Sequence, residues 1–521
     1  MHIVDCFVDN FIIFTIGGEY CRIGEFMKKI FLRITISICI LAVSIAFVGC
    51  KKKDDLDKIG ANLSNYYIDL EYNNSTKSAV SNCEIDYCNP TEALLKEVKL
   101  HLYIASFTRL AKNKVVDDTN FASCFYNGES FATLNIARVL LNGEDISPTY
   151  EGEDNDIMVV ELKSSLYPSE RVNIKIEYSF SLPNCNHRFG YGDNTISFGN
   201  FYPVACVYED GWKTDGYFST GDPFFSDMSN YFVSLKTEDN LTLASTGYVK
   251  NSTTESGAKY YNIEAKCVRD FAFVLSEKFQ KKSAEWKGVE INYYYFNDTN
   301  ADKTLACGVD SIRTFSELFY RYPYKTYNIV EADFCYGGME YPNLSIISSS
   351  VDNDKEYLNV VVHETAHQWW YNLVGNDEYN ESWLDESLTE FSCMLFYDNN
   401  KGYDYNHQDM INSAHQNYLL YKNTYENVLG KLDTSMNRPI NKFNTEPEYT
   451  FTIYCKGVLM YDSLYQLIGE KKFVKSLSLY AHNNAYKIAH ADDLVSAFET
   501  ATNSNLEDFF DCWLTGKVII E

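Results

Sequence analysis

Two histidines and a glutamate occur at the spacing of a metal-binding helix. His363 and His367 are four residues apart in the run His-Glu-Thr-Ala-His, and Glu364 directly follows the first of them. Residues four apart lie on the same face of a helix, so both imidazoles can meet one metal ion. Zinc takes neutral imidazole nitrogens and carboxylate oxygens, and a catalytic zinc site leaves one position open for water. The run therefore predicts a zinc site with the carboxylate of Glu364 beside it.

A third protein ligand is expected from the segment that follows. Glu386 lies 19 positions after His367, within residues 383–391 (WLDESLTEF). This run is typical of a second helix, which can cross the first and deliver a carboxylate to the ion. The alternative is that both histidines are ordinary helical side chains, satisfied by solvent or by hydrogen bonds in the core. A glutamate at this distance favours the metal site.

Three motifs, in this order along the chain, resemble the M1 family of zinc aminopeptidases. Residues 337–341 (GGMEY) are close to the family's Gly-x-Met-Glu-Asn loop. Residues 363–374 (HETAHQWWYNLV) and 383–386 (WLDE) share its zinc motif, with eighteen residues between the second histidine and the glutamate. Residues 454–457 (YCKG) are close to its Tyr-x-Lys-Gly segment. Shorter similarities extend the resemblance over residues 65–515 and lie at residues 202–203, 221–224 and 268–272.

The resemblance implies a chemical role for five residues. One zinc ion per chain would be held by His363, His367 and Glu386. Glu364 would be the general base that takes a proton from the activated water, because zinc acidifies water but does not collect its proton. Tyr454 would donate its hydroxyl to the oxyanion that develops at the cleaved carbonyl.

The resemblance also implies how a peptide is held. Glu340 would bind the free α-ammonium, while Gly337, Gly338 and Met339 would line the substrate backbone, which glycines let approach closely. The implied function is zinc-dependent hydrolysis of the first peptide bond of peptides with a free N-terminus. Two alternatives are a zinc endopeptidase of the cell envelope and a non-catalytic envelope binding lipoprotein. Glu340 argues against the first, and the complete set of catalytic residues argues against the second.

Four features depart from the family pattern. Tyr341 stands where the family has Asn, and Tyr371 stands where many relatives have Gly. A second amine-binding group is expected from residues 197–210 of the β domain, although no residue there can be assigned. Only 67 residues follow Tyr454, too few for the large C-terminal helical domain that is common in the family. A short form with a more open cleft is therefore expected.

The rest of the chain predicts a multidomain α+β fold. Across residues 65–280, apolar and polar residues alternate in short runs such as residues 172–178 (VNIKIEY), which indicates antiparallel sheets in a sandwich or saddle. Helical spacing dominates residues 281–521, for example at Ile312, Phe315 and Phe319. We therefore expect an N-terminal β domain followed by a thermolysin-like metallopeptidase catalytic domain.

Residues 27–49 are typical of a targeting signal, and residues 1–26 lie upstream of the expected start. A basic stretch begins at Met27, the expected start, and an apolar run over residues 34–48 precedes Gly49 and Cys50. This order resembles a bacterial lipoprotein signal cleaved before Cys50, which would become the lipidated first residue. Residues 50–64 would form a solvated tether. The expected location is the extracytoplasmic face of the bacterial cell membrane, with a secreted protein as the alternative.

Composition limits the possible partners. The chain of 521 residues carries 72 acidic and 45 basic side chains, a formal charge of −27. This charge argues against nucleic acid as a partner and against an anionic membrane surface, so only a lipid anchor would hold the protein to a membrane. Eleven cysteines follow Cys50 without a Cys-x-x-Cys pair, which disfavours a zinc ribbon and a dense disulfide framework.

Overall fold

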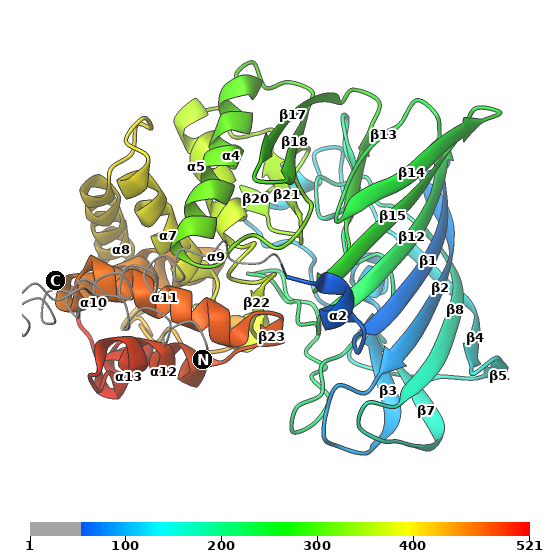
Figure 1. Cartoon of the computed structure of the whole chain (residues 1–521), viewed down its shortest axis with the longest axis horizontal. Coiled ribbons are helices and arrows are strands. Elements are labelled where there is room, and N and C mark those ends of the chain that lie inside the picture. Colours follow the sequence, from blue (N-terminus) through cyan, green and yellow to red (C-terminus); the bar gives the residue numbers. More distant parts are fainter. Residues whose placement is uncertain (1–53) are drawn as a thin grey trace, which may run out of the picture. The chain divides into compact units, whose positions relative to one another are not determined.

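Long half-buried strands build the first part of the protein. The computed structural model describes residues 54–521 (Figure 1), so the predicted signal and Cys50 lie outside the described residues. Along β1 (Ser64–Asn73), buried Tyr66, Ile68, Leu70 and Tyr72 alternate with exposed residues, as the period of a strand with one wet face requires. Before β1, the segment predicted as a tether contains a short helix, α2 (Leu56–Gly60).

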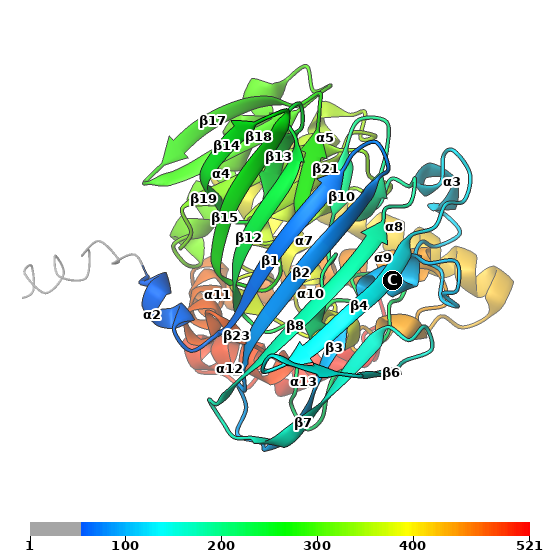
Figure 2. The same cartoon turned by 90° about the vertical axis from the view of Figure 1, so that its right-hand side faces the viewer.

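Eight strands form one large sheet in the order β14-β15-β12-β1-β2-β8-β4-β5. Six of the seven pairings are antiparallel, but β1 and β12 run parallel, which the expectation of purely antiparallel sheets missed. Figure 2 looks onto the outer face of this sheet. The other members are β2 (Ser78–Cys88), β4 (Thr133–Leu141), β5 (Glu144–Ile146), β8 (Arg171–Ser181), β12 (Ser229–Glu238), β14 (Tyr248–Glu255) and β15 (Ala258–Val268).

Two four-stranded sheets accompany the large sheet. Aromatic rings fill the space between layers: Phe198 of β10 meets Tyr72 and Phe180 of the large sheet edge-on, at centroid distances of 5.1 and 6.4 Å. The first sheet, β13-β16-β10-β9, contains β9 (Phe189–Tyr191), β10 (Ile196–Phe198), β13 (Thr242–Ser245) and β16 (Phe273–Ser276). The second, β11-β3-β7-β6, contains β3 (Leu95–His101), β6 (Thr149–Glu151), β7 (Ile157–Leu166) and β11 (Val204–Ala205).

A five-stranded mixed sheet opens the second part of the protein. Its order is β17-β18-β19-β21-β20, with β18, β19 and β21 parallel and β20 antiparallel at the edge. The strands are β17 (Gln280–Trp286), β18 (Val289–Tyr295), β19 (Thr326–Ala332), β20 (Gly338–Met339) and β21 (Leu344–Ser348). Because β20 is an edge strand, one side of its backbone is free of sheet partners.

Helices dominate the remaining chain and lie on the opposite side of the unit from the large sheet (Figure 1). They are α4 (Ala301–Leu318), α5 (Asp354–Ala366), α6 (Glu378–Glu381), α7 (Glu386–Asn399), α8 (His407–Leu429), α9 (Glu446–Thr450), α10 (Gly457–Ile468), α11 (Glu470–Asn484), α12 (Ala491–Thr502) and α13 (Glu507–Leu514). A small parallel pair joins β22 (Val374–Gly375) to β23 (Lys487–Ile488). The predicted multidomain α+β fold, mostly β and then mostly helical, is confirmed.

Two further observations concern membrane-spanning helices and the cysteines. Within residues 54–521, no helix combines the length and the apolar character that a membrane span requires. Among the described residues, none of the eleven cysteines after Cys50 forms a disulfide, and nine of them are buried. Buried thiols behave as small apolar side chains, so these cysteines contribute packing rather than crosslinks.

Candidate metal and substrate site

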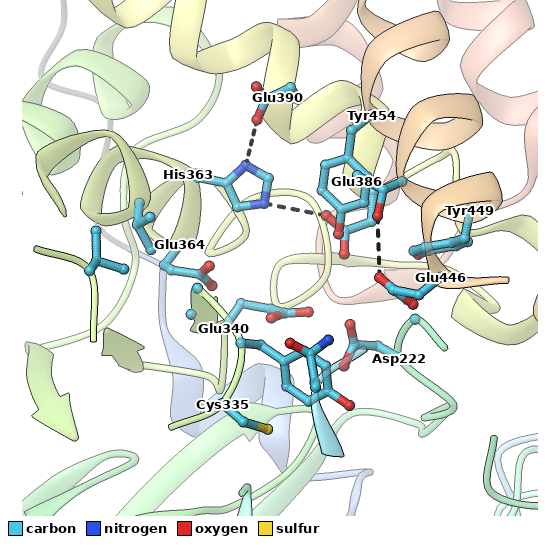
Figure 3. Close-up of a pocket in the computed structure, with 18 of the residues that line it drawn as sticks. Asp222, Cys335, Glu340, His363, Glu364, Glu386, Glu390, Glu446, Tyr449 and Tyr454 are labelled. Atoms are coloured by element: carbon cyan, nitrogen blue, oxygen red, sulfur yellow. Dashed lines mark hydrogen bonds and ion pairs between the residues drawn. The ribbon is translucent and has the colours of Figure 1, made fainter. Parts of the chain in front are cut away.

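Helix α5 and the start of α7 bring three ligand atoms to one point. His363 Nε2 and His367 Nε2 are 3.2 Å apart, and Glu386 Oε2 lies 3.3 Å from each. Figure 3 shows the contact between His363 and Glu386. Tetrahedral coordination with bonds of about 2.0–2.1 Å separates ligand atoms by about 3.3 Å. Glu386 Oε2 is also buried without a hydrogen-bond donor, so the triangle lacks only a cation. The three residues predicted as ligands therefore fit one zinc ion.

Groups around this triangle fix the orientation of both imidazoles. His363 Nδ1 lies 3.0 Å from Glu390 Oε2, and His367 Nδ1 lies 2.9 Å from the carbonyl oxygen of Trp370. When Nδ1 donates to an acceptor, the Nε2 lone pair is left for a metal. Burial acts to raise the pKa of Glu386, but the two imidazoles outweigh it and hold that pKa well below its ordinary value. The third ligand thus stays ionised.

Local sequence explains how the two ligand helices begin. The Asn353 side chain caps α5 by accepting hydrogen bonds from the backbone N–H groups of Lys355 and Glu356. Asp385 caps α7 by accepting from the N–H of Glu386 at 2.8 Å. Glu386 is therefore the first residue of its helix, whereas the sequence placed it inside one. This position lets its carboxylate reach sideways to α5.

Glu364 lies beside the metal triangle and faces the cavity (Figure 3). Its side chain is buried, and Oε2 has no hydrogen-bond partner. Burial, opposed by the charges of the two histidines, raises the pKa of Glu364 to about 7. A carboxylate with a pKa near neutrality is suited to accept a proton and then release it.

Tyr454 stands on the other side of the triangle. It belongs to a π-helical segment, Phe451–Lys456, between α9 and α10, and its ring stacks on His363 at a centroid distance of 5.9 Å. Such segments occur often at functional sites because the extra residue re-aims a side chain. Burial and the charge of Glu386 raise the pKa of Tyr454 well above its ordinary value. The phenol therefore stays protonated and can donate a hydrogen bond.

The loop at residues 337–340 forms the floor of the cavity. Gly338 and Met339 are the edge strand β20, and Glu340 follows them with only 4% of its surface exposed and Oε1 unpartnered. A Cβ on Gly338 would collide with the carboxylate of Glu364 and force it to shift, so glycine at this position keeps Glu364 in place. Gly337 has room for a Cβ, with its nearest neighbour 3.9 Å away on Val360. Of the four residues predicted to bind substrate, Gly337, Gly338 and Glu340 line the cavity, whereas Met339 is buried and does not line it.

Both tyrosines that depart from the family pattern reach into the β part of the protein. Tyr341 donates its hydroxyl to Asn200 Oδ1 at 3.0 Å, and Tyr371 donates to Asp270 Oδ2 at 2.7 Å. The backbone of Tyr371 has φ +137°, a conformation that favours glycine and costs a residue with a side chain about 1–3 kcal/mol. Arg269 Nε donates to the carbonyl of Tyr371 at 2.8 Å and helps to hold this conformation.

Several cavity residues were not found from the sequence. The β part contributes Arg188 and Asp222, and α9 contributes Glu446 and Tyr449. Nothing in the local sequence of Arg188, Glu446 and Tyr449 distinguishes them from ordinary turn or helix residues, whereas Asp222 lies in one of the shorter similarities, residues 221–224. The expectation for residues 197–210 is not met, because none of them lines the cavity and Asn200 instead accepts from Tyr341. Glu390, whose only signal was its position four residues after Glu386, contacts His363.

Helix α9 is held in place by a buried ion pair. Arg438 Nη2 lies 2.8 Å from Glu448 Oε1, and Glu448 is fully buried. We expect Arg438→Met to lower the free energy of unfolding by about 3 kcal/mol, because Glu448 would remain as a buried carboxylate without its cation. Urea denaturation measures the change. The control is Lys163→Met, which breaks an exposed pair with Glu144 and should cost less than about 1 kcal/mol. Equal losses in both variants would contradict the assignment.

The comparisons with known proteins agree with the geometry of the site. Residues 304–513, which include every predicted metal and catalytic residue, match the Peptidase family M1 domain. The chain is 26% identical to aminopeptidase N of Haemophilus influenzae over 402 residues, which cover 75% of this chain and 44% of that protein. It is 24% identical to aminopeptidase N of Lactobacillus delbrueckii over 401 residues, 73% of this chain and 46% of that protein. It therefore spans less than half the length of these curated relatives.

A solved structure shares the architecture over most of both chains. A mutant M1 zinc metallopeptidase from Deinococcus radiodurans, bound to a Tyr-Ser-Ala substrate, superimposes with a TM-score of 0.62 at 14% identity. The match covers 88% of this chain and 94% of that one. At this identity the likeness shows the fold alone. The domain match identifies residues 304–513 as similar to peptidase family M1, and the matches to aminopeptidase N support the same family.

Proposed function

We propose that this protein is a zinc-dependent aminopeptidase, which releases the first residue of peptides with a free N-terminus. The observation that carries the proposal is the position of Glu340. Its buried, unpartnered carboxylate lies in the same cavity as the His363–His367–Glu386 triangle, with Oε atoms of Glu340 and Glu386 within 4.8 Å of each other. Because this carboxylate lies so close to the metal site, the space between them accommodates an α-ammonium but no further residues on the N-terminal side of the cleaved bond.

The residues around the triangle divide the reaction between them. Zinc, when bound there, would supply acidified water and polarise the peptide carbonyl. Glu364 accepts the proton of the attacking water and passes it to the leaving amine, a task suited to its pKa of about 7. Tyr454 donates its hydroxyl where negative charge develops, which by analogy with other oxyanion donors contributes about 3 kcal/mol to the transition state.

The backbone of the substrate also has a site. One side of β20 is unpaired, and this strand leads directly into Glu340. An extended peptide can add to such an edge through main-chain hydrogen bonds. Pairing with β20 would place the first peptide bond between Glu364 and Tyr454 while Glu340 holds the terminal amine. The cavity, about 640 Å³, accommodates the first residues of a peptide.

Glu340→Ala tests the proposal. We expect kcat/KM for leucyl-p-nitroanilide to fall about 100-fold, because a charge-assisted hydrogen bond to the α-ammonium contributes roughly 1.5–3 kcal/mol. Steady-state kinetics of the zinc-loaded protein measure the change. Peptides with free and N-acetylated termini serve as the control pair, and only the free ones should be cleaved. Equal cleavage of both would sink the exopeptidase assignment and favour an endopeptidase.

We also propose that lipid on Cys50 tethers the protein outside the cytoplasmic membrane. The support is the order of a basic stretch, an apolar run and Gly49-Cys50 in the sequence. Cys50→Ser should move the protein from the membrane fraction to the soluble or secreted fraction, since stable attachment needs the acyl chains. Immunoblots of fractionated cells measure the distribution. A wild-type protein found only in the soluble fraction would contradict the anchor.

A further inference from the structure

The wall of the substrate cavity is strongly acidic. Seven Asp and Glu side chains line it, against a single Arg and the two histidines of the metal site. Buried carboxylates are costly unless a cation or hydrogen-bond donors compensate them. The question is therefore which of these acids already have a partner and which one lacks it.

Six of the seven acids have a partner or a place in the proposed chemistry. Arg188 Nη1 lies 2.6 Å from Asp222 Oδ1, so this aspartate has a cationic partner within the protein. Glu356, at the start of α5, accepts a hydrogen bond from the Tyr405 hydroxyl at 2.7 Å. The remaining four belong to the metal site and the amine anchor, and they are Glu340, Glu364, Glu386 and Glu390.

Glu446 has no cationic partner, and unlike Glu356 it has a buried carboxylate oxygen without a hydrogen-bond donor. It is the first residue of α9, and its Oε1 accepts a hydrogen bond from Thr450 Oγ1 at 3.2 Å. Its Oε2 is buried and has no hydrogen-bond partner. Burial and the charges of Asp117 and Asp222 raise the pKa of Glu446 to about 7, although the hydroxyls of Thr450 and Thr220 act to lower it. Such a rise is expected for a carboxylate that lacks a counter-charge.

A second polar group in the same region is also unpartnered. Tyr449, three residues further along α9, lines the cavity, is only 1% exposed, and its hydroxyl has no hydrogen-bond partner. Figure 3 shows Glu446, Tyr449 and Asp222 together on the side of the cavity opposite Glu364. With the α-ammonium of a substrate on Glu340, this side would offer a carboxylate and a phenol to the side chain of the first residue.

We propose that Glu446 determines specificity by receiving a cationic first side chain, so that the preferred substrates begin with arginine or lysine. This inference rests on the proposed aminopeptidase function. A guanidinium or ammonium would give Glu446 Oε2 its missing donor and counter-charge, and the Tyr449 hydroxyl an additional polar contact. An apolar first side chain would leave both groups desolvated and unpaired. This cost discriminates between substrates more strongly than a difference in side-chain size does.

Steady-state kinetics with arginyl-, lysyl-, leucyl- and alanyl-p-nitroanilide test the proposal on the zinc-loaded full chain. We expect kcat/KM for the arginyl and lysyl substrates to exceed the leucyl value at least tenfold. Glu446→Gln should lower kcat/KM for these two by about 100-fold and change the leucyl value less than about threefold. The control is Glu356→Gln, which removes a carboxylate at the rim of the same cavity and should preserve the preference for basic residues.

Two results would overturn the proposal. One is a wild-type protein that cleaves leucyl or alanyl substrates better than both basic ones, and the other is a Glu446→Gln variant that loses activity equally on all four.

A binding measurement separates this inference from the proposed function. If no anilide is cleaved, the aminopeptidase proposal fails, and the effects of arginine amide and leucine amide on thermal unfolding then decide. Greater stabilisation by arginine amide, lost in Glu446→Gln, supports the pocket, and equal effects refute it.

Discussion

Glu364→Gln is expected to lower kcat/KM for leucyl-p-nitroanilide by about 1,000-fold while zinc remains bound. Glutamine keeps the size of the side chain but cannot accept the proton of the attacking water, and general-base catalysis typically contributes a factor of about 10² to 10⁴. The zinc ligands are untouched, because the triangle consists of His363, His367 and Glu386. Initial-rate kinetics give the loss of activity, and atomic absorption gives the zinc content of the same sample.

A matched variant on the same helix checks that the loss is chemical. Glu356→Gln makes the identical exchange two turns earlier on α5, where the side chain contacts Tyr405 and not the metal site. It should keep kcat/KM for the leucyl substrate within about threefold of the wild type. A zinc-loaded Glu364→Gln protein with more than a tenth of wild-type activity would show that another group collects the proton.

Glu386→Ala should abolish both zinc binding and turnover. Its Oε2 is one corner of the ligand triangle and has no other partner in the structure. Loss of a residue that merely orients a ligand costs about 10- to 100-fold in metal affinity, so loss of a direct ligand should cost more than 100-fold. Zinc content after dialysis against a weak chelator measures the affinity, and anilide hydrolysis measures turnover.

Glu390→Gln is the matched control for this experiment. Glu390 contacts His363 Nδ1 rather than the ion, so this variant should bind zinc only about 10- to 100-fold more weakly. Excess zinc should then restore its activity but not that of Glu386→Ala. A Glu386→Ala protein that retains zinc and full turnover would remove the basis of the proposed mechanism.

Local sequence rules were sufficient for the elements that carry the metal site. The four-residue spacing of His363 and His367 requires only a helix, and α5 supplies one. Alternation within residues 172–178 likewise predicted the strand β8, because its pattern repeats every two residues. These patterns are short-range, so a single sequence contains them in full.

Local sequence patterns could not predict contacts between residues far apart in the sequence. Asp222 and Glu446 are more than two hundred residues apart in the sequence, and only the folded chain places both on one cavity wall. The parallel pairing of β1 with β12 has the same character, since alternation within a strand does not identify its neighbour. The contacts of Tyr341 with Asn200 and of Tyr371 with Asp270 show why these departures are tolerated, which the motifs alone left open.

Those two tyrosine contacts have a consequence for evolution and engineering. They join the substrate loop and the segment after the zinc helix to the β half, which also supplies Arg188 and Asp222 to the cavity wall. The helical half therefore depends on the β half for these contacts and for part of the cavity wall. A chimera that combines it with another β half would need hydrogen-bond acceptors at the positions of Asn200 and Asp270 to keep both contacts.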